Sequence, residues 1–225
     1  TIVQRPNQVM APLDYDMSCQ LHGLLRKKGI TLKFGSSVTG FEEKDGLILT
    51  TLKDDEPLKS DLVILAIGVT PDTALAKDAG LALGIKGSIT VNERMETSAP
   101  DVYAVGDAVQ VKNFVTGEDA LISLAGPANK QGRIAADNIC GLKSSYDGSQ
   151  GSSVIKIFDM TAATTGINEK TAKQLGIDYD KVVLFPLSHA GYYPGALAMS
   201  MKVIYEKKTL RLLGAQIVGY EGVDK

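Results

Sequence analysis

The spacing of hydrophobic positions in the first part of the chain alternates between that of a helix and that of strands. Apolar residues recur every three or four positions over residues 14–28, and Gly29 follows, which predicts a helix ending there. Shorter apolar runs predict strands over residues 31–34, 38–42 and 47–52, with the turn Lys44-Asp45-Gly46 forming a hairpin. The longer apolar run at residues 61–69 predicts a buried strand of a parallel sheet.

The middle of the chain repeats this mixture of strand and helix. Residues 102–105 are apolar and rich in valine, which predicts a strand covered on both faces and closed by Gly106 and Asp107. Residues 123–141 predict a helix with Pro127 near its first turn and Gly141 as its stop. A short helix over 74–80 and a short strand over 88–91 are also expected.

From residue 143 to 153 the composition shifts to Ser and Gly, which predicts a boundary before a second unit. Beyond it, strands are predicted over 154–159, 181–186, 199–205 and 210–218. One helix is expected over 168–175, with Asn168 as its N-cap after the turn residues at 164–166. The fold class is therefore α/β, a partial nucleotide-binding domain with three-layer ββα character, followed by an α+β domain.

Composition changes this picture little. Apolar residues make up 44% and charged residues 22%, with a net charge of −2 and a pI near 5.7, so neither nucleic acid nor a membrane is an expected partner. No apolar run approaches the roughly 18 residues that span a bilayer, and we expect a cytoplasmic protein. Cys19 and Cys140 form no C-x-x-C pair and are expected to be core or surface fillers. His22 is expected on a helix surface.

The Gly106-Asp107 pair is the first candidate for chemistry. Ligands of open α/β sheets collect at the carboxyl ends of strands, where a glycine allows close approach and a carboxylate accepts a hydroxyl hydrogen bond. Read alone, the pair is equally well an ordinary turn. The predicted helix that follows adds a second feature, because an amino-terminal helix end favours a phosphate or an electron-rich ring.

These two features together, the run from Thr97 to Ala108 and the helix that carries Ala128-Asn129-Lys130-Gln131-Gly132-Arg133, closely resemble the second flavin-contacting segment of the pyridine nucleotide-disulfide oxidoreductases. The resemblance extends over essentially the whole chain and implies FAD and NAD(P)H as cofactors. It implies FAD contacts at Gly106, Asp107, Ala125 and Ala128, with Asp107 on the ribityl chain. It also implies that Gly68 lies against the nicotinamide dinucleotide.

The start of the chain resembles the second strand of a nucleotide-binding βαβ unit, where an acidic residue would bind the adenosine ribose. Gln4 and Arg5 stand there instead. Arg5 suits a 2′-phosphate but is equally well a surface arginine, so the choice between NADH and NADPH stays open.

No G-x-G-x-x-G precedes this strand, and we expect the chain to be a fragment of a longer protein. The domains expected are a partial NAD(P)-binding domain over 1–75, a return segment of the FAD domain over 76–148, and a truncated dimerisation domain over 152–225 that forms a homodimer. The redox cysteine of the family would lie outside the fragment, and neither Cys19 nor Cys140 replaces it.

The loop Ser188-His189-Ala190-Gly191-Tyr192-Tyr193-Pro194-Gly195 carries the substrate clue. Two adjacent tyrosines are more often an aromatic plug, but a phenol can also donate a proton to a thiolate. The loop resembles that of the coenzyme A disulfide reductases, which implies that Tyr193, or else Tyr192, assists the partner subunit's cysteine. His189 is expected to order the loop.

The function predicted for the parent is therefore FAD- and NAD(P)H-dependent reduction of coenzyme A disulfide or a related small disulfide or persulfide. Two alternatives remain open at this point. One is an NADH oxidase or peroxidase on the same scaffold. The other is that the isolated chain is a dimerisation and nucleotide-edge module without catalysis.

Overall fold

The computed structural model describes residues 1–224, and Lys225, at the end of the expected dimerisation domain, lies outside them. The chain divides into two compact units, which are described separately below. The first comprises residues 1–67, 154–163 and 168–225, and the second comprises residues 68–153 and 164–167. The mixed α/β architecture predicted from the sequence is confirmed.

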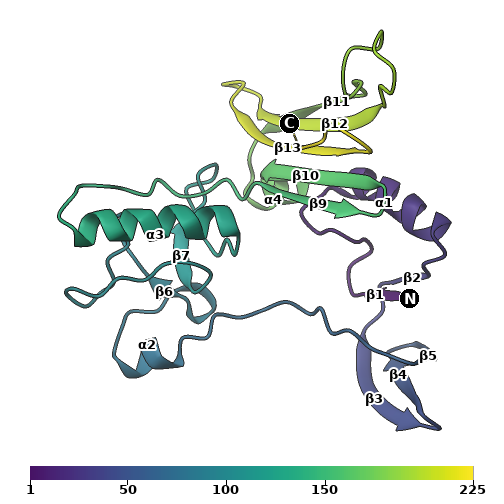
Figure 1. The fold of residues 1–225 in the computed structure, drawn as a ribbon, viewed down its shortest axis with the longest axis horizontal. Coiled ribbons are helices and arrows are strands. Elements are labelled where there is room, and N and C mark those ends of the chain that lie inside the picture. The colour runs from purple at the N-terminus through teal and green to yellow at the C-terminus, as the bar shows by residue number, and fades with distance from the viewer. Residues whose placement is uncertain (225) are drawn as a thin grey trace. The chain divides into compact units, whose positions relative to one another are not determined.

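The first unit begins with a small parallel sheet, β1 (Ile2–Gln4) beside β2 (Leu32–Phe34), joined by α1 (Tyr15–Lys27). Helix α1 follows the predicted periodicity, since Met17, Leu21, Leu24 and Leu25 are all buried along one face. They form a core cluster with Met160, Ala162 and Val218 from the later strands, so α1 packs against the carboxyl-terminal part of the chain (Figure 1).

A three-stranded antiparallel meander follows, built from β3 (Val38–Lys44), β4 (Leu47–Leu52) and β5 (Asp55–Ser60). The predicted hairpin turn is present: Asp45 and Gly46 both have positive φ, 54° and 75°, as a type I′ turn requires. Strand β5 was not predicted. It contains Pro57 and lies at the edge of the sheet, where a missing N–H is tolerated.

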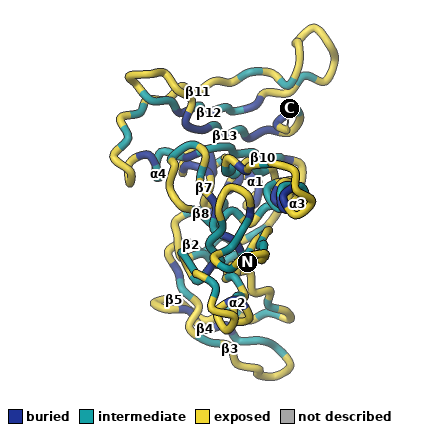
Figure 2. The backbone as a smooth tube through the Cα atoms, turned by 90° about the vertical axis from the view of Figure 1, so that its left-hand side faces the viewer, coloured by how far each residue is buried: buried dark blue, intermediate teal, exposed yellow. Residues whose placement is uncertain are grey.

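The carboxyl-terminal part forms a five-stranded sheet in the order β11-β12-β13-β10-β9. Its strands are β9 (Ser153–Ile157), β10 (Met160–Gly166), β11 (Tyr179–Leu184), β12 (Met199–Glu206) and β13 (Leu212–Gly219). The predicted helix is α4 (Glu169–Gln174), and Asn168 caps it by accepting the Thr171 N–H at 2.9 Å. Strand β10 was missed because its Thr-Thr-Gly end was interpreted as a turn. Figure 2 shows the contrast between buried β13 and exposed β11.

The second unit packs the long helix α3 (Ala125–Ile139) on short strands. These elements are α2 (Ala74–Asp78), a 3₁₀ turn at Ile85–Gly87, β6 (Ile89–Thr90), β7 (Val109–Lys112) and β8 (Asp119–Ala120). Its core contains Met95, Val109, Val111, Ala135 and Tyr146. Helix α3 matches the predicted helix, and Gly141, with φ 82°, follows its end as expected.

Two strand predictions in this part of the chain are wrong. Residues 61–69 form no strand, and Ile64 and Ile67 are 81% and 87% exposed. An apolar run becomes a buried strand only where neighbouring strands and covering layers exist, and residues 1–224 supply none for it. Residues 102–105 form only an isolated bridge between Tyr103 and Glu96, with the flanking valines partly exposed.

The expectation for His22 is also wrong. Its ring is buried on the inner face of α1 and packs against Phe34, with ring centroids 4.7 Å apart. The helical spacing of four puts His22 beside the buried Ser18, whose hydroxyl lies 3.2 Å from Nε2, rather than on the surface. Both cysteines are free and exposed, consistent with surface fillers.

Candidate functional site

The predicted nucleotide residues Gln4 and Arg5 lie at the carboxyl end of β1. The Gln4 carbonyl accepts the Ser36 N–H at 3.2 Å, which fixes the strand end against the residues after β2. Arg5 is exposed. The residues that follow, 6–13, form a segment without regular secondary structure that leads into α1, and we call it the nucleotide loop.

Helix α1 holds the nucleotide loop from one side. The Val9 N–H donates to Nε2 of His22 at 3.2 Å, and the Ser18 hydroxyl donates to the Val9 carbonyl at 2.6 Å. Burial lowers the pKa of His22, and the charge of Arg26 lowers it further. The neutral ring is the form that this contact needs, because Nε2 can accept a hydrogen bond only while it carries no proton.

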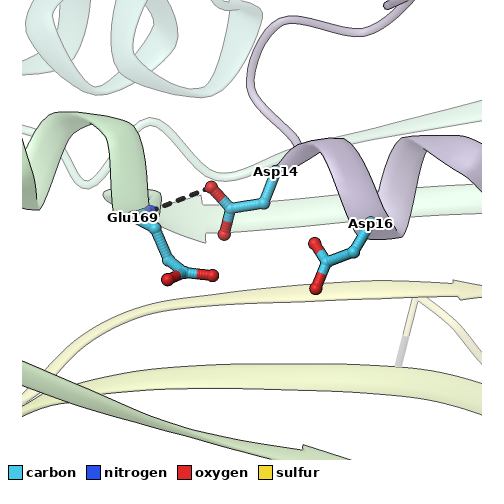
Figure 3. Close-up of side chains that lie close together, drawn as sticks. All are labelled: Asp14, Asp16 and Glu169. Carbon is cyan, nitrogen blue, oxygen red and sulfur yellow. Dashed lines mark hydrogen bonds between the residues drawn. The ribbon is translucent and has the colours of Figure 1, made fainter.

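A buried ammonium group lies beside the other end of the loop. The Lys202 side chain on β12 is 1% exposed, and its Nζ bonds both carboxylate oxygens of Asp16 at 2.8 Å and Asp14 at 3.2 Å. It also pairs closely with Glu169. Asp14 and Asp16 come from the start of α1 and Glu169 from the start of α4, and the three carboxylates converge (Figure 3). We call these four residues the Lys202 network.

Further hydrogen bonds fix the carboxylates of the Lys202 network. The Glu169 N–H donates to Asp14 Oδ1 at 3.0 Å, the dashed line of Figure 3. The Gln216 amide bonds Asp14 twice, donating to Oδ2 at 2.7 Å and accepting the backbone N–H at 2.6 Å. Lys181 and Tyr179 each donate to the Glu169 carboxylate, at 2.7 and 2.8 Å.

These contacts set the protonation states of the network. Burial raises the pKa of Glu169, but the hydrogen bonds from Lys181, Lys202 and Tyr179 outweigh it and lower that pKa to about 2. Burial lowers the pKa of Lys202, but hydrogen bonds to Asp16 and Glu169 and the charge of Asp14 reverse this and raise it. Burial and the bond to Glu169 raise the pKa of Tyr179 to about 12. Glu169 and Lys202 therefore stay charged near neutrality, and the Tyr179 phenol stays protonated.

Asp14, Asp16 and Glu169 form the one cluster among residues 1–224 with the spacing of a metal site. Lys202 Nζ, however, already contacts all three carboxylates. The protein thus supplies its own cation, and a divalent ion there would meet an adjacent buried positive charge. The geometry is that of an internal ion-pair network.

The lowered pKa of Glu169 gives a pH-dependent contribution to stability. That pKa falls from its ordinary value of 4.5 to about 2 in the folded chain, so the stabilisation is present above pH 4.5 and is lost as the pH falls towards 2. We expect the unfolding free energy of Glu169→Gln to fall less over this window than that of the unsubstituted protein. Urea denaturation at several pH values measures it, with exposed Glu221→Gln as the control. Parallel curves for Glu169→Gln and the unsubstituted protein would refute it.

A cavity of about 720 Å³ separates the nucleotide loop from α4. Asn7 and Gln8 line it from the loop, Lys170 and Lys173 from α4, and the carboxylates of the Lys202 network border it. Beside this cavity, the hydrogen bonds of Asn168 join the loop to the N-cap of α4.

The second unit carries the residues predicted to contact a flavin. Gly106 has φ 87°, and its N–H donates at 2.7 Å to Gln131, a side chain of α3 that is 1% exposed. This bond ties the Gly-Asp turn to the helix. The Asp107 carboxylate is exposed beside it. Ala125 and Ala128 lie in the first turn of α3, where no side chain caps the helix.

Gly68 also belongs to the second unit, whereas Gln4 and Arg5 belong to the first. It has φ 93° and open space around its Cα, so its conformation is one that favours glycine. The structure thus gathers Gly106, Asp107, Ala125 and Ala128 on adjoining elements but does not bring Gly68 to them.

Tyr192 and Tyr193 lie in the loop between β11 and β12. They are 82% and 60% exposed, and their rings stack at a tilt with centroids 4.7 Å apart. Tyr193 is the more fixed of the two, since its N–H donates to the Ala190 carbonyl at 3.0 Å and its ring meets the edge of His189 at 6.5 Å. The pair is not a plug over the sheet, because both rings face solvent.

Sequence reasoning missed the Lys202 network. One signal was present: Lys202 and Ile204 share one face of the strand at a spacing of two, so a buried face for Ile204 implies a buried lysine in need of carboxylates. The nearest of those carboxylates, that of Glu169, lies more than thirty residues from Lys202 in the sequence. No local pattern therefore identified them.

Known proteins resemble this chain in both sequence and fold. The family description "Pyridine nucleotide-disulphide oxidoreductase" matches residues 1–132, and its dimerisation domain matches residues 152–224. A CoA-dependent NAD(P)H sulfur oxidoreductase of Pyrococcus abyssi is 35% identical over 195 residues, covering 87% of this chain and 44% of that protein. A coenzyme A disulfide reductase of Staphylococcus epidermidis is 30% identical over 226 residues, covering 100% and 50%.

Among solved structures, the reduced CoADR-RHD of Bacillus anthracis superposes with a TM-score of 0.95 at 47% identity, covering 99% of this chain and 40% of that one. The chain thus spans about half the length, or less, of the relatives it matches. No helix in residues 1–224 has the length and apolar character needed to cross a membrane.

Proposed function

Because the chain belongs to the pyridine nucleotide-disulphide oxidoreductases, we propose that it forms part of an enzyme that reduces coenzyme A disulfide or a related small disulfide or persulfide. Members of this family bind FAD and NAD(P)H. The observation that carries the proposal is the exposed Tyr192-Tyr193 pair on a dimerisation domain, in a chain 30% identical along its length to a coenzyme A disulfide reductase.

The residues of the second unit fit a flavin. The Asp107 carboxylate is exposed and the first turn of α3 is uncapped, so an acceptor for ribityl hydroxyls and donors for an electron-rich ring lie on adjoining elements. Gln131 holds the Gly106 N–H and fixes the turn that bears Asp107. When bound, FAD supplies the electron transfer between NAD(P)H and sulfur. Asp107, Gly106, Ala125 and Ala128 orient it.

The first unit would carry residues that contact the nucleotide and residues that act on the substrate. Gln4 and Arg5 would contact the adenosine side of NAD(P)H. The Tyr193 phenol, or that of Tyr192, would donate a proton or hydrogen bond to a cysteine thiolate of the partner subunit. This requires a homodimer through residues 152–225. The partly exposed apolar side chains of β11, Val182, Val183 and Leu184, support one, because association would bury them.

The proposal is tested on the protein that carries this chain. We expect the purified protein to contain flavin and to oxidise NADH or NADPH when coenzyme A disulfide is added. Faster turnover with oxygen or peroxide than with any disulfide would instead favour the oxidase or peroxidase alternative. A colourless preparation with no turnover would favour a module without catalysis. Comparison of NADH with NADPH, in the unsubstituted protein and in Arg5→Ala, tests the role of Arg5.

Asp107→Ala is expected to weaken FAD binding. A hydrogen bond to a charged acceptor contributes roughly 1.5–3 kcal/mol, which corresponds to about a ten- to hundredfold rise in the dissociation constant. Flavin content after dialysis and titration of the apoprotein with FAD measure the effect. Asp147→Ala, an exposed aspartate in the same unit, is the control and should bind FAD normally. Equal affinity in the two variants would remove Asp107 from the site.

A further inference from the structure

The nucleotide loop is fixed by the carboxyl-terminal part of the chain as well as by its own helix. Asn168 donates its side-chain amide to the carbonyls of Ala11 and Pro12, at 3.3 and 3.2 Å. These bonds join residues 156 and 157 positions apart in sequence. They attach the N-cap of α4 directly to the end of the nucleotide loop, whose first residue follows Arg5.

The residue after the loop is held by the same part of the chain. Gln216 on β13 binds both the backbone N–H and the carboxylate of Asp14, and Lys202 on β12 pairs with that carboxylate and with Asp16. Gln216 and Lys202 are each 1% exposed. Buried polar groups of this kind have few alternative partners, so they favour one position of the loop end strongly.

The cavity between the loop and α4 makes these bonds decisive. Where two segments pack continuously, the loss of one hydrogen bond leaves many contacts to hold them. Here the loop faces a cavity of about 720 Å³, and the Asn168 amide joins α4 to the loop itself, while the Lys202 network holds Asp14 and Asp16, which follow the loop. Loss of the Asn168 bonds would remove these direct hydrogen bonds between the loop and the N-cap of α4.

We infer that Asn168, Lys202 and Gln216 are positioning residues for the nicotinamide dinucleotide, and that the carboxyl-terminal domain sets nucleotide affinity within its own subunit. The inference rests on the proposed function, because it takes Gln4 and Arg5 as nucleotide contacts. None of the three touches the nucleotide. They act through the nucleotide loop, which follows Arg5 directly in the sequence.

Asn168→Ser is the variant that tests this inference, in the full-length protein with its flavin. Serine retains an N-cap acceptor for the Thr171 N–H but is too short to reach the Ala11 and Pro12 carbonyls, so α4 is preserved and the loop is released. We expect the dissociation constant and KM for NAD(P)H to rise about fivefold or more. The kcat at saturating nucleotide and the KM for coenzyme A disulfide should not change.

Lys181→Met is the matched control. Lys181 bonds the same Glu169 oxygen as Lys202 and, among the described residues, donates to nothing in α1 or the loop, so its loss should leave nucleotide affinity within about twofold of the original. Lys202→Met should weaken nucleotide binding as Asn168→Ser does, and Lys202→Arg should restore part of it. If Lys202→Met does not fold, Asn168→Ser still decides.

Three results overturn the inference. The first is unchanged nucleotide affinity in Asn168→Ser while the unsubstituted enzyme is functional, which overturns the inference but not the proposed function. The second is a fall in kcat and in all affinities together, which would mean a general loss of structure. If the unsubstituted protein itself does not bind NAD(P)H, the proposed function and the inference fail together. The nucleotide titration of the unsubstituted protein separates this last case from the first two.

Discussion

Lys202→Met is expected to lower the free energy of unfolding by about 3–5 kcal/mol, the largest effect on stability from a single substitution that we expect in this chain. The substitution removes the cation and leaves the carboxylates of Asp14, Asp16 and Glu169 together with no charge at the centre. All three lie within 4.8 Å of one another through their nearest oxygens. The mutual repulsion of the three carboxylates and the cost of burying those of Asp14 and Glu169 then oppose folding.

Urea denaturation of the protein that carries this chain measures this effect, and Lys181→Met is again the matched control. The Lys181 side chain is 42% exposed, against 1% for Lys202, so water screens its pair with Glu169 and its loss should cost at most about 1 kcal/mol. Equal destabilisation by the two variants would mean that burial of Lys202 carries no special weight.

Tyr193→Phe is expected to lower kcat with coenzyme A disulfide by about 10²-fold, the range in which a positioned general acid contributes. The substitution removes one hydroxyl and keeps the ring, its stacking on Tyr192 and its contact with His189. Flavin content and the rate at which NAD(P)H reduces the flavin should not change, because the role proposed for the tyrosine lies on the sulfur side of the reaction.

Tyr192→Phe is the control for this prediction. Tyr192 is 82% exposed, whereas Tyr193 is held by Ala190 and His189, so we expect the loss of activity to be concentrated in Tyr193. A loss of activity in Tyr192→Phe but not in Tyr193→Phe would assign the role to the Tyr192 phenol. Full activity in both single variants and in the double variant would exclude a phenol from the reaction.

The sequence predicted the elements whose signal is local. Helix α1 follows from its apolar spacing and the glycine after it, the hairpin from Asp45-Gly46, and the start of α4 from the cap at Asn168. In each, neighbouring residues form the structure and hold it. The mixed α/β class followed from such local signals, whereas the family followed from the resemblance of residues 97–108 and of the helix after them.

The features that depend on distant segments were predicted poorly. Residues 61–69 have the composition of a buried strand, but Ile67 is 87% exposed because burial depends on strands that must pair with it. His22 looked like a surface residue, yet Val9 and Phe34 cover it. The Lys202 network joins the two ends of the chain, over 186 positions between Asp16 and Lys202, and only the fold brings its members together.

The most direct test of the proposed function follows the flavin itself. The protein that carries this chain is reduced without oxygen by one equivalent of NAD(P)H, and coenzyme A disulfide is then added while the flavin absorbance is recorded. We predict that the nucleotide bleaches the flavin band and that the disulfide restores it, with release of coenzyme A thiol. A flavin that stays reduced after coenzyme A disulfide, persulfide and related small disulfides, and regains its colour only with oxygen or peroxide, would contradict the proposal.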